Sequence, residues 1–421
     1  MWRRRNDEYD SQNDSDDTRN EELKQVRKVR FLDRLEHFTW ANFTFPMSTG
    51  GISLLLAQQT QPFNFRGLQT IGKVFYIFDL VVFSFITMCM VTRFLRFSGS
   101  LKKSITSPTE GLFLGTAQLS LASIIVGIAR YGIPECGPWL VVVYRVLFWI
   151  YFAVGWLIAV GQYTMLFTSP KLKAADMTPA WDLPIFPFML SGTIASAGAS
   201  HQPPEHAVPM IVAGVTAQGL GMLVSLCMYA LYCRRMIEFG FPAVQSRPGM
   251  YIAVGPPAFT ALALIGMAKS FPTTQGYWGD AEMTVQILKV LAAVTGIFIW
   301  SLSLWFWCIT TLACLQVWRE LKFSLTWWAF VFPNVGFTIA TITIGQTLES
   351  TAVKWVGAIM TILLIATWIF VFINYVRAIC RNTIWVAGKN EQANKDFADN
   401  HNHELSKMAK IAKEFDEEKQ A

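Results

Sequence analysis

Long apolar segments dominate this sequence and restrict what it can fold into. A helix needs about 20 mostly apolar residues to cross a bilayer, and ten segments of the 421-residue chain meet that requirement. They span residues 38–57, 71–95, 111–133, 138–167, 180–199, 207–236, 249–271, 283–317, 325–348 and 352–380. Charged residues make up only 15% of the chain, against about 25% in an ordinary soluble domain. The pattern predicts an all-α polytopic membrane protein and argues against a soluble enzyme.

Charged residues gather at the two ends and in short gaps between the apolar segments. This divides the chain into a cytosolic N-terminal tail over 1–37, a ten-helix transmembrane domain over 38–380 and a cytosolic C-terminal tail over 381–421. Residues 24–36 of the first tail predict a short helix on the inner membrane surface, or else a simple extension of the first span. Lys and Arg concentrate in alternate loops, as they do in cytoplasmic loops, so both termini are expected in the cytoplasm.

Proline lies inside the odd-numbered segments far more often than inside the even-numbered ones. The intramembrane prolines are Pro46, Pro184, Pro187, Pro256, Pro257 and Pro333. Proline removes a backbone hydrogen bond and disrupts a helix, which a membrane tolerates where neighbours or a water-lined cavity satisfy the freed groups. The odd segments also concentrate Gly, Ser and Thr, and the third segment, which lacks proline, shares this composition.

The prolines and small residues of the odd segments are centred near residues 46, 115, 187, 257 and 333. This spacing of about 70 residues corresponds to one helical hairpin per period. With both termini inside, five hairpins would bring five parallel odd helices around one axis, lining a central pore. The even helices would then form an apolar outer ring. Internal repetition of this kind is typical of transporters. The alternative is that the small residues only mediate tight helix packing.

The candidates for lining such a pore or binding its substrate are small, hydroxyl, amide and proline residues of the odd segments. They are Ser48, Thr49, Gly50, Gln118, Ser191, Thr193, Pro256, Pro257, Thr260, Asn334 and Thr338. Arg130 and Lys269 lie near the outer ends of odd segments and would attract anions, although each could simply be a snorkelling interfacial side chain. Asp79 is the only acid well inside a span, so no acidic ring for cations is present. A path lined by neutral hydrogen-bond donors, with basic residues at its entrance, suits an anion.

Catalytic chemistry has little support in the sequence. No nucleophile elbow, metalloprotease motif or phosphate-binding loop is present. His201 and His206 flank the stretch QPPE, where two prolines prevent the helical spacing that metal-binding histidines use. We therefore predict neither catalytic residues, nor a metal, nor a cofactor. The basic residues form no patch that would bind nucleic acid, so the expected partners are an anionic substrate and the lipid bilayer.

Four stretches resemble the fungal malic acid transport proteins of the tellurite-resistance/dicarboxylate transporter family, which is related to plant slow-type anion channels. They are HFTWANFTFPMSTGGI at 37–52, PAWDLPIFPF at 179–188, RPGMYIAVGPPAFTA at 247–261 and WWAFVFPNVGF at 327–337. The resemblance implies five helical hairpins, one pore per subunit and a homotrimer. It also implies transport of C4-dicarboxylates at the plasma membrane, chiefly malate and also succinate and fumarate. Proton coupling occurs among malate permeases of this family. The alternative is a sulfite or inorganic-anion exporter, because fungal sulfite efflux pumps are more distant relatives.

The same resemblance suggests a pore gate. In the channel relatives a phenylalanine on the ninth helix plugs the pore, and the motif FVFP makes Phe332 its expected counterpart. Phe330 and Phe337 are rivals, and ordinary packing of Phe332 is the alternative. Asp79 departs from the family pattern, since a related permease has an uncharged residue there, so the resemblance gives Asp79 no role.

Overall fold

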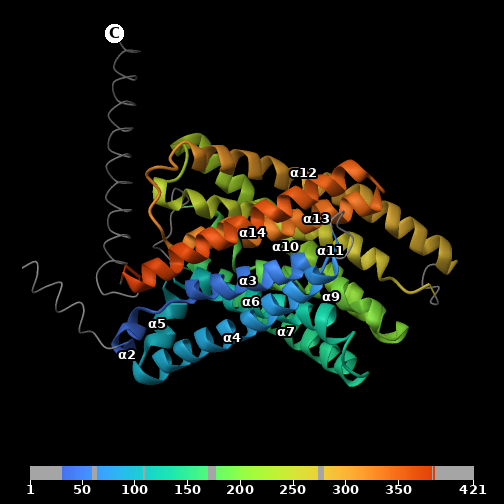
Figure 1. Ribbon diagram of the computed structural model, residues 1–421, viewed down its shortest axis with the longest axis horizontal. Helices are drawn as coiled ribbons and strands as arrows, with labels where there is room; N and C mark the ends of the chain where they lie inside the picture. The colour runs from blue at the N-terminus through green and yellow to red at the C-terminus, as the bar shows by residue number, and fades with distance from the viewer. Residues whose placement is uncertain are drawn as a thin grey trace, which may run out of the picture.

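The computed structural model describes residues 31–58, 64–107, 110–168, 177–273, 279–381 and 383–384. Throughout these ranges the regular secondary structure is helical (Figure 1). Most of the predicted surface helix over 24–36 lies outside the described residues. Its end is present as α2 (Phe31–Arg34) followed by the 3-10 helix η1 (Leu35–His37). Nearly all of the C-terminal tail also lies outside the described ranges.

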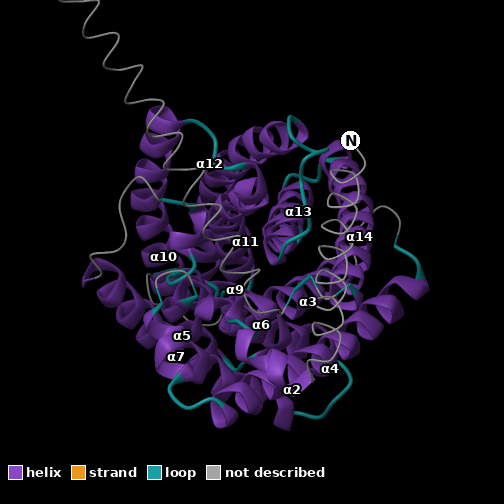
Figure 2. Cartoon of the chain, turned by 90° about the vertical axis from the view of Figure 1, so that its left-hand side faces the viewer, coloured by secondary structure: helices purple, strands orange, loops and turns teal. Residues whose placement is uncertain are grey.

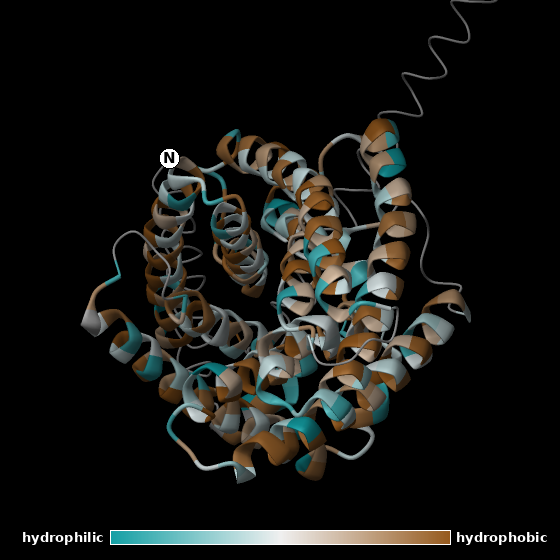
Figure 3. Cartoon of the chain, turned by 90° about the vertical axis from the view of Figure 1, so that its right-hand side faces the viewer, coloured by the Kyte–Doolittle hydropathy of each residue, from teal (hydrophilic) through white to brown (hydrophobic). Residues whose placement is uncertain are grey.

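Five long helices correspond to the even-numbered segments: α4 (Arg66–Arg96), α7 (Trp139–Thr168), α10 (Pro204–Phe239), α12 (Ala281–Leu315) and α14 (Thr351–Cys380). They lie around the outside of the molecule (Figure 2). Between 11% and 44% of their most apolar stretches is buried, and hydrophobic residues cover much of their length (Figure 3). Long helices that keep apolar side chains exposed are typical of a lipid-facing surface.

The odd-numbered segments form the interior as shorter, interrupted helices. The α-helical parts are α3 (Thr44–Leu56), α6 (Leu114–Gly127), α8 (Phe186–Met189), α9 (Ser191–Gly198), α11 (Gly255–Lys269) and α13 (Phe332–Thr347). They are flanked by η2 (Trp40–Phe43), η3 (Gly111–Phe113), η4 (Ile128–Gly132), η6 (Pro179–Asp182), η7 (Ala199–His201), η8 (Val244–Val254) and η9 (Leu325–Phe330). Figure 2 shows α3, α6, α9, α11 and α13 enclosed by the long helices, and every described residue of α3 is buried.

The structure gives the helix-breaking prolines a definite place. Pro187, Pro256 and Pro333 each lie in the first turn of an α-helix, and Pro46 is the third residue of α3. Backbone N–H groups in a first turn have no partner within the helix, so proline there removes no helical hydrogen bond. A 3-10 helix immediately precedes α3 and α11, one turn residue separates η9 from α13, and α8 follows a turn. The predicted breaks are thus changes from 3-10 to α-helix.

Eight helical stretches in the described ranges are long and apolar enough to cross a membrane. They correspond to all five even segments and to the third, seventh and ninth segments. The first segment yields α3, which has 13 residues, and the fifth is divided among η6, α8, α9 and η7. The chain is therefore a multi-pass membrane protein, in which two of the ten predicted spans are built from shorter pieces.

A buried ion pair fastens the end of α4 to the start of the next inner stretch. Arg93 in the last turn of α4 lies 2.5 Å from Glu110, measured from Nη1 to Oε1, and Glu110 directly precedes η3. The two side chains are only 6% and 15% exposed. Lys73 and Glu135 form a second pair at 2.7 Å, but their side chains are 38% and 62% exposed. The two pairs should differ in their contribution to stability.

We expect Glu110→Gln to lower the free energy of unfolding by about 3 kcal/mol, because it leaves the buried charge of Arg93 uncompensated. Glu135→Gln should have little effect, since water already screens that pair. Thermal unfolding of both variants in the same detergent measures the difference. Equal melting temperatures for the two variants would contradict a stabilising role for the Arg93–Glu110 pair.

Candidate functional site

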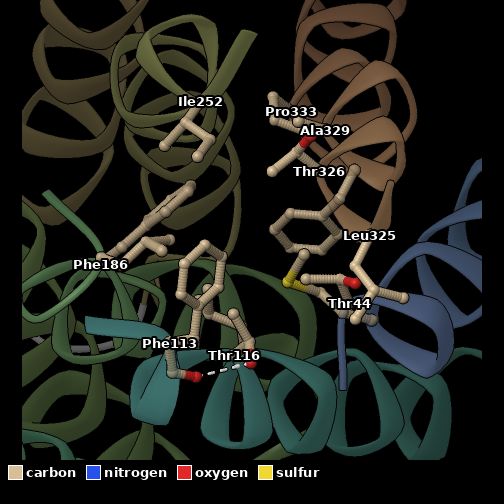
Figure 4. Close-up of a pocket in the computed structure, with 13 residues that line it drawn as sticks. Thr44, Phe113, Thr116, Phe186, Ile252, Leu325, Thr326, Ala329 and Pro333 are labelled. Carbon is tan, nitrogen blue, oxygen red and sulfur yellow. Dashed lines mark hydrogen bonds between the residues drawn. The ribbon is translucent and has the colours of Figure 1, made fainter. Parts of the chain in front are cut away.

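A cavity opens at the end of the molecule where the inner stretches begin. Its lining comes from the first residues of all five inner stretches, including Thr44, Thr116, Phe186, Ile252 and Ala329 (Figure 4). It encloses about 430 Å³ of space, its mouth included. The first residues of all five inner stretches thus meet around one cavity.

Three phenylalanine rings from different inner stretches pack against one another beside this cavity. Phe332 stacks on Phe259 with ring centroids 5.2 Å apart, and its edge-on contact with Phe186 measures 6.2 Å. Phe186 and Phe259 are themselves 5.7 Å apart. All three side chains are buried, and Phe186 and Phe332 line the cavity. We call these three residues the phenylalanine cluster.

Glycines on neighbouring helices make room for the cluster. A Cβ atom added to Gly336 would lie 2.5 Å from Phe259, and one added to Gly255 would lie 2.8 Å from Phe186. A Cβ atom on Gly51 would lie 3.4 Å from Phe332. The rings therefore pack directly against helix backbone.

The two rivals of Phe332 face other parts of the protein. The Phe330 ring lies 5.4 Å from Tyr251 and also contacts Trp327. Phe337 stacks on Trp300 at 5.5 Å, which belongs to the outer helix α12. Of the three phenylalanines that the sequence singled out on the ninth segment, Phe332 alone lines the cavity.

Sequence reasoning missed Phe186 and Phe259. A signal was available for Phe186, which precedes Pro187 just as Phe332 precedes Pro333. The Phe-Pro dipeptide is not sufficient, however. Phe45 precedes Pro46, yet its ring lies 4.9 Å from Trp328 and contacts the outer helix α14. Only packing between helices separates these cases.

Several predicted polar residues join inner helices to outer ones. The Thr49 hydroxyl accepts a hydrogen bond of 3.3 Å from Trp368 Nε1 on α14. Gln118 donates from Nε2 to the Tyr151 carbonyl on α7 at 3.0 Å. The Thr260 hydroxyl lies 2.8 Å from the Gln218 amide on α10. These side chains satisfy polar groups inside the helical wall.

Another group of predicted residues compensates the helix breaks. Ser48 donates to the Trp328 carbonyl in η9 at 3.3 Å, and Asn334 Nδ2 donates to the Phe330 carbonyl at 2.9 Å. The hydroxyls of Thr338 and Thr260 donate to the carbonyls of Asn334 and Pro256, each at 2.7 Å. Carbonyls near a break need such donors, because a membrane interior supplies no water.

A third group is buried and retains unused hydrogen-bonding capacity. Ser191 Oγ, Thr193 Oγ1 and Asn334 Oδ1 have no partner among the described residues. Ser191 begins α9 and Thr193 follows two residues later. Their hydroxyls are therefore free to donate to an anion. The remaining candidates lack polar side chains: Pro256 and Pro257 are buried in the first turn of α11, and Gly50 packs against Asp79.

The predicted basic residues lie where the inner stretches end. Arg130, in η4, is exposed, and no hydrogen bond to its guanidinium occurs within the described residues. Its charge acts on His201 at the end of the fifth stretch. Lys269 ends α11 and is exposed within electrostatic reach of Lys289. The two candidates thus lie at separate places: Arg130 acts on His201 of the fifth stretch, and Lys269 of the seventh stretch acts on Lys289 of α12.

The charge of Arg130 contributes to the titration of His201. Partial burial is the larger cause that lowers the pKa of His201, and the nearby positive charge of Arg130 adds to it. Both causes disfavour the imidazolium. At neutral pH the imidazole of His201 is therefore neutral, and Arg130 is the cation of this pair. The described residues include no cluster of three His, Cys, Asp or Glu side chains that could hold a metal ion.

An apolar outer ring, interrupted inner helices and a cavity beside packed aromatic rings define a multi-pass membrane transport protein. The family model described as voltage-dependent anion channel (SLAC1) matches residues 37–376. The malic acid transport protein of Schizosaccharomyces pombe is 37% identical over 390 residues, which cover 88% of this chain and 89% of that relative. The chain therefore belongs to the voltage-dependent anion channel family.

Sulfite efflux pumps of Trichophyton rubrum and Arthroderma otae are more distant. They are 27% and 25% identical over 337 residues, which cover 78% of this chain and 88% of each relative. The names of the family and of these relatives describe channels, transporters and pumps. This confirms the resemblance found in the sequence and the expectation that the chain is not an enzyme.

We expect Arg130→Gln to raise the pKa of His201, because it removes the second cause that disfavours the imidazolium. The pKa should remain below its ordinary value, since burial persists. Nuclear magnetic resonance of histidine-labelled protein, with the His201 signal assigned through a His201→Gln variant, measures the titration. An unchanged His201 titration would contradict the placement of Arg130 beside this imidazole.

Proposed function

We propose that this protein transports C4-dicarboxylates across the plasma membrane, chiefly malate and also succinate and fumarate. The observation that carries this proposal is the match to a malic acid transport protein over 88% of the chain. The cavity between the inner stretches supports it, since this cavity is the entrance that an anion path would need. A sulfite or inorganic-anion exporter on the same scaffold is the second candidate, favoured by the similarity to sulfite efflux pumps.

A carboxylate crossing this path must find donors at every depth, because a bare charge in an apolar medium costs many kcal/mol. Ser191 and Thr193 are suited to this role, since their buried hydroxyls have no partner among the described residues. The path begins at the cavity, passes the phenylalanine cluster and ends near Arg130 and Lys269. These exposed cations attract the anion weakly, and salt screens their attraction.

Phe332 is the proposed gate of this path. It lines the cavity, and its ring contacts Phe186 and Phe259 from two other inner stretches. Passage of a dicarboxylate requires Phe332 to rotate or move aside. Phe186 and Phe259 form the surface against which it closes.

The wider arrangement belongs to the same proposal. Ten membrane-crossing segments form five hairpins, with the odd helices lining one pore per subunit and the even helices facing lipid. Both termini lie in the cytoplasm, so the cavity faces the cytoplasm, and three subunits assemble as a homotrimer. Residues 38–380 form the transport domain, and the flanking tails are cytosolic. Protons are a second transported species.

Uptake of labelled malate into proteoliposomes of the purified protein tests the proposed function. We expect saturable uptake that succinate inhibits and sulfite does not, because the path would be selective for dicarboxylates. Empty liposomes are the control. Flux of sulfite without flux of malate would favour the second candidate.

We expect Phe332→Ala to raise basal malate flux several-fold, because it removes the ring of the proposed gate. Phe330→Ala is the matched control, since it removes a ring of the same size that contacts Tyr251 and Trp327 instead of the cluster. Flux per protein in the proteoliposome assay measures both variants. If Phe332→Ala leaves flux at the level of Phe330→Ala, another group closes the path.

A further inference from the structure

Asp79 is a fully buried acid in the middle of an outer helix. It lies in α4, it is 0% exposed, and neither carboxyl oxygen has a hydrogen-bond partner among the described residues. Asp182 is the other buried acid in the described ranges, and Ser225 donates to its two carboxyl oxygens at 2.9 and 2.8 Å. Asp79 therefore differs from Asp182 in having no side-chain donor, and the backbone of Gly50 is the group that favours a negative charge on it.

No cation is hydrogen-bonded to Asp79 among the residues that the structure describes. Tyr76 on the same helix donates its hydroxyl to the Ile124 carbonyl at 3.0 Å, and Tyr131 donates to the Ser53 carbonyl at 2.5 Å. Of the helices that pack against α4 near Asp79, α3 and α6 lack ionisable residues. A buried carboxylate without a partner is strongly unfavourable. The carboxyl group is consequently neutral, with its proton in place, in the conformation seen here.

Other ionisable groups on neighbouring elements form no ion pair with Asp79, and they include Arg130 in η4, next to Tyr131, whose ring lies 5.6 Å from that of Tyr76. On α4 itself Lys73 is paired with Glu135, and Arg93 with Glu110. The elements η1 and α5 (Ser100–Thr106) adjoin the end of α4 beyond Phe94, about 22 Å from Asp79 along the helix. The ionisable residues of α14, which packs on α4 through Trp368 and Phe75, are Lys354, Tyr375, Arg377 and Cys380, toward its ends. None of these would neutralise an ionised Asp79.

Two adjacent glycines connect Asp79 to the phenylalanine cluster. A Cβ atom added to Gly50 would lie 2.6 Å from Asp79 Oδ2, so the carboxyl group packs directly against the backbone of α3. The next residue, Gly51, faces α13, because its added Cβ would lie 3.2 Å from Val335 Cγ2 and 3.4 Å from Phe332 Cδ2. One short piece of α3 therefore touches the acid on one side and the gate on the other.

We propose that Asp79 is a proton-binding site whose charge state controls the position of Phe332 through Gly50 and Gly51. Loss of the proton transfers it to a water molecule and leaves a carboxylate pressed against α3. The carboxylate needs solvation, so α3 must shift to admit water, and Gly51 then ceases to support Phe332. Return of a proton from water on the other side restores the neutral acid and the closed cluster. One proton moves per cycle, and no other reactant is needed.

This inference rests on the proposed transport function and assigns its proton coupling to a particular side chain. We expect an imposed pH gradient to drive wild-type proteoliposomes to accumulate malate above its external concentration. Asp79→Asn stays neutral and therefore keeps the cluster closed, so it should lose this accumulation and most of the downhill malate flux. Accumulation is the informative measurement, because protonation of malate itself makes the rate of flux depend on pH in any variant.

Asp182→Asn is the matched control, because it removes the other buried acid while leaving Asp79 in place. It should keep gradient-driven accumulation even if the protein becomes less stable. Full accumulation by Asp79→Asn, or equal loss in both variants, would overturn the proposal. If the wild type carries sulfite and no malate, the proposed function fails, and the same gradient measurement with sulfite still decides the role of Asp79.

Thermal unfolding provides a measurement independent of transport. An asparagine reproduces the shape of a neutral aspartic acid, so Asp79→Asn should fold and melt within a few degrees of the wild type at neutral pH. A variant that fails to fold, or melts far below the wild type, would contradict a neutral Asp79 and overturn the proposal.

Discussion

The backbone groups released where the inner helices break are the constraint on which the rest of the structure depends. No water is available inside a membrane to satisfy them. Side chains from neighbouring helices therefore donate hydrogen bonds to them. Ser48 donates to the Trp328 carbonyl, and Tyr151 donates to the Pro187 carbonyl at 2.8 Å. Such bonds fix how the inner stretches sit against one another. The cavity and the phenylalanine cluster lie at these same breaks. The interruptions that need these hydrogen bonds therefore also form the candidate site.

Much of the fold could be predicted from the sequence, because its signals are local. Apolar length identifies the segments, and the helices begin and end close to the predicted limits. Prolines mark the interruptions because the ring prevents ordinary helix continuation. What could not be predicted is how each interruption is built. The division of the fifth segment into η6, α8, α9 and η7 depends on packing against α7, α10 and α11, which no local pattern encodes.

The candidate site was less predictable, since it depends on which way each side chain points. Phe332 was identified through resemblance, whereas Phe186 and Phe259 required the packed structure. Polar composition identified the inner helices, but it did not show which of their polar side chains face outer helices. Thr49, Gln118 and Thr260 are occupied in contacts with outer helices, while Ser191 and Thr193 keep free hydroxyls among the described residues. Helical spacing alone does not distinguish these two situations.

The cavity is bounded by five similar stretches of a single chain, and three of them each contribute one ring to the phenylalanine cluster. In a channel built from identical subunits, one substitution changes every copy of a constriction at once. Here each position around the axis belongs to a different codon, so the ring of one stretch can be altered while the others stay the same. In related proteins with this fold, a single substitution can therefore change one side of the proposed constriction. The constriction can become asymmetric, and so suit anions of different shape, one residue at a time.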